Sequence, residues 1–283
     1  MPLQMAHKNK TNVSPMRSRQ GREHRKPQQI YTIGEANDRL LDCFRNHNFG
    51  HITHEQRQKL AEFYVLLMSN QEKENFTRLL TLKDVAIRHF IDCLIVARLT
   101  PIQFPLMDIG TGPGFPGIPL KILFPNDKII LAEGVQRRVE FLKSVREEMK
   151  LKELDIIGRN INPFFAYPVN GVISRAVEDI RNTLTNVLTC LNTGGCVYFM
   201  KGPNVDPEIP LAEKELGEYF KLEKDIAYEL PHTPHKRRLL IYRKVKPAPI
   251  IDFEDEPFPG DDEKPVLVRR RPTPDHGDQN ESH

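Results

Sequence analysis

The part of the sequence best suited to hold a ligand is a glycine-rich stretch from Asp108 to Gly117. It reads Asp-Ile-Gly-Thr-Gly-Pro-Gly-Phe-Pro-Gly and stands between an apolar run and a segment with helical character. Glycines permit positive φ and remove the β-carbons that would keep a ligand away from the backbone. Free amide N–H groups at the start of a helix attract the negative end of a ligand. We therefore expect a cofactor here, because open α/β sheets bind ligands at loops that follow the strands.

Two classes of cofactor fit this loop. Gly112-x-Gly114-x-x-Gly117 matches the dinucleotide pattern, which alone is weak evidence, whereas Gly110-x-Gly112-x-Gly114 after Asp108 matches the pattern for S-adenosyl-L-methionine (SAM). Glu133, after the next apolar run, would accept hydrogen bonds from ribose hydroxyls in either class. Prolines 113, 116 and 119 remove amide N–H groups that a pyrophosphate would need. The loop therefore favours SAM over NAD, and a glycine cluster that binds nothing is the third reading.

Short apolar runs on both sides of the loop predict strands. They are Leu106–Ile109, Ile129–Ala132, Leu154–Ile157, Gly171–Ser174, Cys196–Met200 and Leu239–Tyr242. Helices are expected from about Pro116, over Gln136–Met149, and near residues 177–190 and 208–219. Strands that alternate with helices predict a mostly parallel α/β sheet covered on both faces.

Three further helices are expected ahead of this sheet. They run from Gly34 to about Arg45, from a Thr53 cap to about Met68, and from about Lys83 to Arg98, with apolar residues three and four apart. We therefore expect a small helical N-terminal subdomain, residues 31–100, packed on a core of residues 101–245.

The two ends of the chain have opposite charge. Residues 1–30 carry seven Lys or Arg and one acid, and the proline-rich residues 246–283 carry five Lys or Arg and ten acids. Neither end holds enough large apolar groups to offset the cost of ordering, so both are predicted to be disordered. The basic end is either a solubilising tail or an arm that contacts phosphates. The charge between the ends is about +2, so any nucleic-acid contact must be local.

The composition excludes several classes of protein. No apolar run approaches the ~18 residues of a transmembrane helix, and the basic start lacks the apolar block of a secretory signal. The cysteines at 43, 93, 190 and 196 form no CxxC pair and have no histidine at zinc-ligand spacing. We therefore expect a metal-free cytoplasmic protein with reduced thiols. Since the sequence has no coiled-coil pattern, we expect a monomer.

Further motifs flank the glycine loop in a fixed order. They are Asn75-Phe76-Thr77, Arg88-His89-Phe90-Ile91-Asp92-Cys93-Leu94, the extended string Gly114-Phe115-Pro116-Gly117-Ile118-Pro119-Leu120-Lys121-Ile122, Ser174-Arg175-Ala176-Val177 and Lys201-Gly202. Over residues 35–245 the chain resembles the RsmG (GidB) family. The extended string carries most of the specificity, because GxGxG alone fits most SAM enzymes.

The resemblance implies an α/β fold, a Rossmann-like (class I) SAM-dependent methyltransferase with the helical N-terminal subdomain. It also implies methyl transfer from SAM to N7 of a guanine in the 530 loop of 16S rRNA, with 16S rRNA or the small ribosomal subunit as partner. The residues implied at the cofactor are Asp108, Gly110, Gly112, Gly114, Phe115, Glu133 and Arg175. Those implied on the RNA side are Arg88, His89, Asp92, Arg175 and Lys201.

The sequence departs from the family pattern in three places. Cys93 replaces a serine, and Asn-Phe-Thr replaces Asn-Leu-Thr. The acid expected after the third strand is missing, and Asn160 or Asn162 can pair with the adenine amino group instead. Asn162-Pro163-Phe164-Phe165 is similar to a signature of amino-group methyltransferases, but it lacks the second proline. We interpret it as a turn with core phenylalanines.

Methylation at guanine N7 needs positioning rather than a strong base, because N7 carries a free lone pair. Arg175 can chelate guanine O6 or a phosphate, or form an ion pair with an acid. Arg88 and Asp92 are spaced for an ordinary ion pair on a helix. His89 can be a packing residue, and Lys201 an exposed lysine. The group His232, His235, Lys236, Arg237 and Arg238 is either a phosphate patch or a solvated loop.

Three other functions stay open from the sequence. The chain can be a SAM enzyme that acts on another RNA, a protein or a small molecule, because fold does not decide substrate. It can be an NAD-dependent oxidoreductase, or a non-catalytic RNA-binding protein that kept the pocket.

Overall fold

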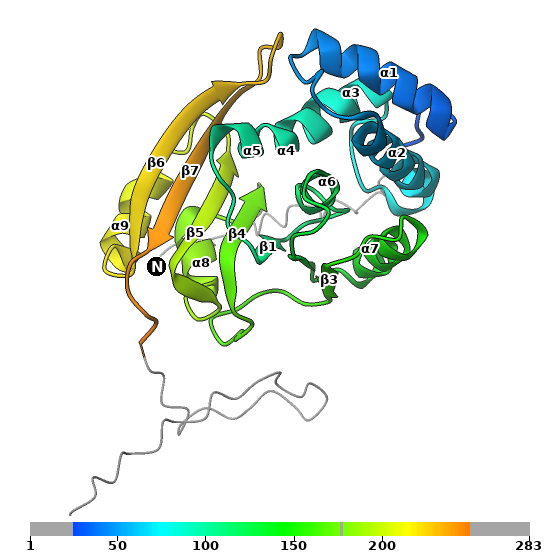
Figure 1. Ribbon diagram of the computed structural model, residues 1–283. Helices are drawn as coiled ribbons and strands as arrows, with labels where there is room; N and C mark the ends of the chain where they lie inside the picture. The colour runs from blue at the N-terminus through cyan, green and yellow to red at the C-terminus, as the bar shows by residue number, and fades with distance from the viewer. Residues whose placement is uncertain (1–24, 176–177, 250–283) are drawn as a thin grey trace, which may run out of the picture.

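A seven-stranded sheet forms the centre of the molecule (Figure 1), in a computed structural model that describes residues 25–175 and 178–249. The strands are β1 (Leu106–Ile109), β2 (Ile129–Ala132), β3 (Leu154–Ile157), β4 (Val169–Arg175), β5 (Leu191–Lys201), β6 (Phe220–Glu229) and β7 (Lys236–Lys244). Their order is β3-β2-β1-β4-β5-β7-β6. The first five strands are parallel, and β7 runs antiparallel to both of its neighbours. This is the open, doubly wound sheet of Rossmann-like proteins.

Alternate side chains of the central strands enter two separate hydrophobic clusters, one on each face of the sheet. The first holds Leu106, Leu131, Ile173, Tyr198 and Ile241. The second holds Met107, Ile130, Val172, Phe199 and Tyr242. Burial of both faces explains why these strands are almost wholly apolar.

Helices cover both faces of the sheet. On the right in Figure 1 lie α1 (Ile33–Asn46), α2 (His54–Glu74), α6 (Gly117–Leu123) and α7 (Gln136–Glu148). On the left lie α8 (Ile180–Asn186) and α9 (Glu208–Leu216). Thr32 with Glu35 forms a capping box at α1, and Thr53 with Gln56 forms one at α2. Such boxes satisfy amide groups that a helix start leaves without partners.

The segment between α2 and β1 is not the single helix expected over residues 83–98. It consists of α3 (Leu82–Val85), the π-helix η1 (Ala86–Ile91), α4 (Asp92–Leu94) and α5 (Val96–Leu99). A π-helical turn changes which side chains share a face and is often found at functional sites. Arg88, within this turn, is exposed, whereas Asp92, directly after it, is buried.

The sheet confirms the α/β prediction and all six predicted strands. The strand β6 was not predicted, for a reason taken up in the Discussion. The N-terminal helices contribute to the same hydrophobic cluster as the sheet, and the division at residues 31–100 and 101–245 stays a prediction. The predicted disorder of the tails falls largely on residues 1–24 and 250–283, which lie outside the described residues.

The described residues include neither a candidate membrane span nor a candidate metal site. No helix there is both long and apolar enough to cross a membrane. No group of three or more His, Cys, Asp or Glu side chains in that part of the chain is arranged to hold a metal ion.

Candidate active site

Three segments reach the same edge of the sheet because β1 pairs in register with β2 and β4. Ile109 lies beside Ala132 on one side and beside Ser174 on the other. The glycine loop, Glu133 and Arg175 therefore converge at the carboxyl ends of parallel strands. The strand order reverses between β1 and β4, and a reversal of this kind is where open α/β sheets bind ligands.

The backbone of the glycine loop adopts a conformation that glycine favours. The φ angle is +64° at Gly110, +62° at Gly112 and +113° at Gly114. A β-carbon added to Gly114 would lie 2.6 Å from Cγ1 of Ile118, whereas one added to Gly112 would meet no atom within 4 Å. Gly114 therefore serves close packing, and Gly112 borders open space in which a ligand can lie.

Asp108 links two parts of the glycine loop by hydrogen bonds. Its Oδ2 accepts hydrogen bonds from Oγ1 of Thr111 (2.6 Å) and from the amide of Gly117 (2.7 Å). Burial raises the pKa of the carboxyl group to about 7, although these two hydrogen bonds lower it. The other oxygen, Oδ1, is buried without a hydrogen-bond partner among the described residues. A buried acceptor in this condition is costly and favours a donor supplied by a ligand.

Glu133 holds the loop from the side of β2. Its Oε2 accepts from the amide of Gly112 and its Oε1 from that of Val135, both at 2.9 Å, and Arg138 lies 3.5 Å from Oε1. The carboxylate therefore lies directly beside the open space at Gly112, where a residue that binds the ribose hydroxyls is expected.

The two asparagines after β3 have different environments. The side-chain oxygen of Asn160 lies against Gly134, so close that an added β-carbon would be 2.2 Å away. Asn162 instead accepts from the amide of Phe164 and forms a turn. Phe165 is buried and Phe164 is 56% exposed, so the predicted turn is present and only one phenylalanine belongs to the core. Of the two asparagines, Asn160 is next to the segment that follows β2.

His89 is fixed on both ring nitrogens. Nε2 lies 3.0 Å from Oγ1 of Thr77, and Nδ1 lies 3.1 Å from Nη2 of Arg175. Since arginine can only donate, Nδ1 accepts and Nε2 carries the proton. Burial, with Arg175 and Arg88 nearby, holds the pKa of His89 well below its usual value. The ring stacks on Phe115 at a centroid distance of 4.2 Å, so His89 is a neutral, rigid support.

Arg175 is enclosed by the groups around it. Nη1 lies 3.5 Å from Oδ2 of Asp92, and the guanidinium lies over the ring of Phe115 at 5.3 Å. Asp92 also contacts Nε of Arg237 and the hydroxyl of Tyr228, each at 3.5 Å. Burial raises the pKa of Asp92, while the two arginines lower it. Asp92, the first residue of α4, thus joins α4, β4 and the β6–β7 hairpin through one carboxylate.

Among the described residues, the side chains of the other two predicted RNA-side residues, Arg88 and Lys201, form no hydrogen bond or ion pair with this group. Arg88 is exposed and lines an open cleft beside the hairpin, and the pair predicted with Asp92 is replaced by the Asp92–Arg175 pair. Lys201 is only 10% exposed, donates to the carbonyl of Glu178 and pairs with Glu208 at 2.9 Å. It ties β5 to α9, and an exposed lysine was the wrong alternative.

Sequence reasoning did not assign three members of the site. Thr77 belongs to a recognised motif, but its hydrogen bond to His89 depends on the buried side chain of Gln71, which bonds the Thr77 backbone. Tyr228 stands in the strand that was not predicted. Arg237 was noted only within a basic group, and its contact with Asp92 connects positions 145 residues apart.

A family model matches residues 56–240, and its description reads "rRNA small subunit methyltransferase G" (GidB). The chain belongs to this family. In the GidB family, ribosomal RNA small subunit methyltransferase G 2 of Bdellovibrio bacteriovorus is 66% identical over 82% of this chain and 91% of its own length. Ribosomal RNA small subunit methyltransferase G of Carboxydothermus hydrogenoformans is 34% identical over 78% of this chain and 93% of its own.

One GidB relative is much longer than this chain. Ribosomal RNA small subunit methyltransferase G 2 of Syntrophobacter fumaroxidans is 39% identical over 69% of this chain, which spans only 39% of that relative. Among solved structures, a methyltransferase from Pyrococcus furiosus is 17% identical, with a TM-score of 0.45 over 56% of this chain and 83% of its own. Family membership confirms the predicted resemblance, the Rossmann-like fold and SAM as the cofactor.

Proposed function

We propose that this protein transfers the methyl group of SAM to N7 of a guanine in the 530 loop of 16S rRNA. It acts in the cytoplasm as a monomer, on the rRNA or on the small subunit. The family and its relatives' names support a small-subunit rRNA substrate. The choice of N7 as the methyl acceptor rests on His89 and Asp92. Their polar atoms are already bonded to Thr77 and to the arginines, so neither is free to act as a base.

That observation bears on the reaction because methyl acceptors differ in their need for a base. An exocyclic amine or a hydroxyl must lose a proton when it is methylated, and a positioned base contributes much of the rate enhancement of such a transfer. Guanine N7 has a free lone pair and needs none. A site in which the nearest imidazole is neutral and doubly hydrogen-bonded suits N7, where orientation alone lowers the barrier.

The loop and its neighbours suit the cofactor. Asp108, Gly110, Gly112 and Gly114 would hold the methionine part, Glu133 the ribose and Asn160 the adenine, with Phe115 behind them. SAM supplies an electrophilic methyl group on a sulfonium. The chain's own contribution is to orient the base: Arg175 presents donors that suit guanine O6, and Asp92 offsets the positive charge of Arg175 as the base becomes cationic.

The test is methyl transfer from labelled SAM to small subunits that lack the 530-loop methyl group, followed by mapping of the label. We expect label at N7 of one guanine. Gly112→Asp should abolish it, because a carboxylate would occupy the open space and strain the loop. Arg175→Ala should lower the rate roughly 10- to 100-fold, the value of a good bidentate contact to a base.

Arg243→Ala is the matched control, because Arg243 pairs with Glu223 in the β6–β7 hairpin and should not affect transfer. Binding of SAM without transfer to any small-subunit RNA would show that the proposed substrate is wrong. Label at another atom or on another RNA would support methyltransferase activity but reject the proposed target.

A further inference from the structure

An open cleft of about 440 Å³ lies beside the candidate active site, between the N-terminal helices and the β6–β7 hairpin. It is lined by Asn46, His47, Lys83, Asp84, Ile87, Arg88, His232, Thr233, Pro234 and His235. Figure 1 shows the tip of the hairpin beside the end of α1, and the rings of His47 and His232 are 6.2 Å apart. The cleft therefore joins segments that are distant in the sequence.

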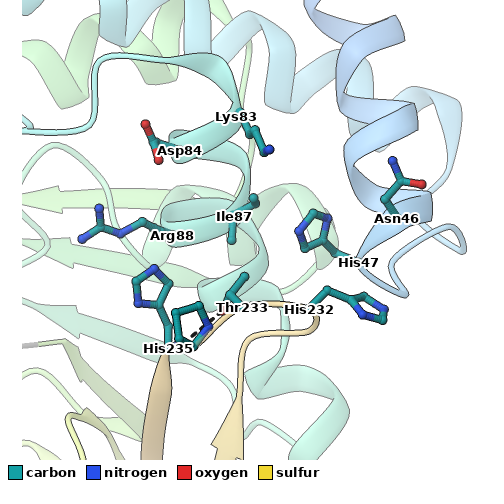
Figure 2. Close-up of a pocket in the computed structure, with 10 residues that line it drawn as sticks. Asn46, His47, Lys83, Asp84, Ile87, Arg88, His232, Thr233 and His235 are labelled. Atoms are coloured by element: carbon teal, nitrogen blue, oxygen red, sulfur yellow. Dashed lines mark hydrogen bonds between the residues drawn. The ribbon is translucent and has the colours of Figure 1, made fainter.

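Five of the ten residues that line the cleft are lysine, arginine or histidine. Figure 2 shows Arg88 and His235 on one side of Ile87, and His47 and His232 on the other. Lys83, Arg88 and His232 are exposed. The one acid, Asp84, accepts a hydrogen bond from Oγ1 of Thr81 at 2.7 Å, as part of the cap of α3.

The lysine and arginine of the cleft differ from other basic residues nearby, which form ion pairs with acids. Arg237 pairs with Asp92, Arg238 with Asp206 and Asp225, and Lys201 with Glu208. Among residues 25–175 and 178–249, neither Lys83 nor Arg88 belongs to an ion pair. Positive groups left unpaired at a concave surface attract a negatively charged partner.

The cleft is continuous with the site through two elements. Arg88 precedes His89 on η1, and His235 lies in the hairpin turn directly before β7, two residues from Arg237. A strand of RNA that places its base at Arg175 would therefore pass over the cleft with its neighbouring phosphates.

We propose that this cleft binds the phosphodiester backbone next to the target guanine. This inference rests on the proposed function and gives it a second contact with the substrate, made by Lys83, Arg88 and the histidines of the hairpin. The contact explains how a chain with a nearly neutral body can hold RNA, since a local group of cations is enough for phosphate binding.

The test uses the full-length double variant Lys83→Gln/Arg88→Gln and the second double variant His232→Gln/His235→Gln. The matched control is Lys143→Gln/Lys152→Gln, which removes two exposed lysines from α7 and the loop after it. Each protein is assayed for SAM affinity, for affinity to unmethylated small subunits over a range of salt, for single-turnover transfer, and by phosphate-ethylation footprinting at saturating protein.

We expect Lys83→Gln/Arg88→Gln to bind subunits at least 10-fold more weakly at about 0.15 M salt, with a salt slope shallower by about 1 to 2, because each lost phosphate contact removes roughly 0.7–0.9. SAM affinity should not change. The footprint should lose a few phosphates beside the target guanine, and the hairpin variant should lose some of the same ones. The control should match the wild type.

Each other outcome overturns the inference in a recognisable way. Wild-type transfer with normal binding by both cleft variants would reject the cleft and leave the proposed function intact. Weaker binding with every phosphate protection retained would show that the cleft contacts a ribosomal protein instead of RNA. No transfer by the wild type to any rRNA would reject the proposed function, and the cleft inference with it.

Discussion

At the scale of single residues, the site consists of groups that hold one another. One oxygen of Asp108 and one of Glu133 accept hydrogen bonds from the glycine loop. Nδ1 of His89 accepts from Arg175, and Asp92 pairs with Arg175 and Arg237. Residue type and spacing were enough to place Asp108, Glu133 and Arg175 at one edge of the sheet, because each was expected at or just after the end of a strand, and their roles stay predictions. They could not predict Arg237, since only the folded hairpin brings it to Asp92.

The buried carboxyl group of Asp108 makes stability depend on pH. Its pKa is raised from 3.8 to about 7 in the folded protein, so the fold favours the protonated form. The stabilisation from this proton is fully present below the unfolded pKa and is lost as pH rises through about 7. Asp108→Asn, which is neutral throughout, should therefore gain stability relative to the wild type as pH rises from 3.8 to about 7, with no further gain above that.

The measurement is the free energy of unfolding in urea at several pH values for Asp108→Asn and the wild type. Asp155→Asn, at the half-exposed Lys128 ion pair, is the control, and its difference from the wild type should vary little over this range. A constant difference between Asp108→Asn and the wild type would show that Asp108 does not titrate there.

Asp92 should contribute strongly to stability, because it is 3% exposed and faces two arginines. Asp92→Asn leaves both guanidinium groups without their carboxylate. Breaking a buried pair typically costs about 3–5 kcal/mol, and the partial exposure of the arginines should reduce this to roughly 2–3 kcal/mol. Arg237→Gln keeps the Asp92–Arg175 pair and should cost less. Equal losses in urea unfolding would contradict this ranking.

At the scale of elements, the predictable features are those with a regular period. The central strands are buried on both faces and read as short apolar runs. The edge strand β6 is different, because most of its residues are exposed and its register shifts between Leu222 and Lys224. The shift interrupts the alternation that would reveal a strand. The π-helix η1 was missed similarly, since its spacing still resembles that of an α-helix.

The cap of α2 was predicted from the sequence and can be tested alone. The side chain of Thr53 accepts from the amide of Gln56, and the Gln56 side chain accepts from the amide of Thr53. Thr53→Ala should lower the free energy of unfolding by about 1 kcal/mol. Thr53→Ser keeps the hydroxyl and should lie close to the wild type. An equal effect of both substitutions in thermal unfolding would mean that the methyl group matters and the cap does not.

At the scale of the whole molecule, the N-terminal helices and the catalytic sheet share one hydrophobic cluster. Phe63 of α2 contacts Phe90 of η1 and Phe115 of the glycine loop, at centroid distances of 6.2 and 5.2 Å. The ring of Phe115 in turn supports His89. The helices expected as a subdomain therefore pack directly against the glycine loop through Phe63.

This shared core predicts that a ligand at the glycine loop stabilises the helices and the sheet together. SAM at about 100 times its Kd should add roughly 2.7 kcal/mol, which raises Tm by about 5–10 °C for a domain of this size. Far-ultraviolet circular dichroism should show one transition that moves as a whole. NAD at the same concentration should not move it, and Gly112→Asp should fold but give no shift with SAM. Two transitions of which SAM moves only one would show that the helices fold independently of the site, and that their contacts with Phe115 do not couple them to the cofactor.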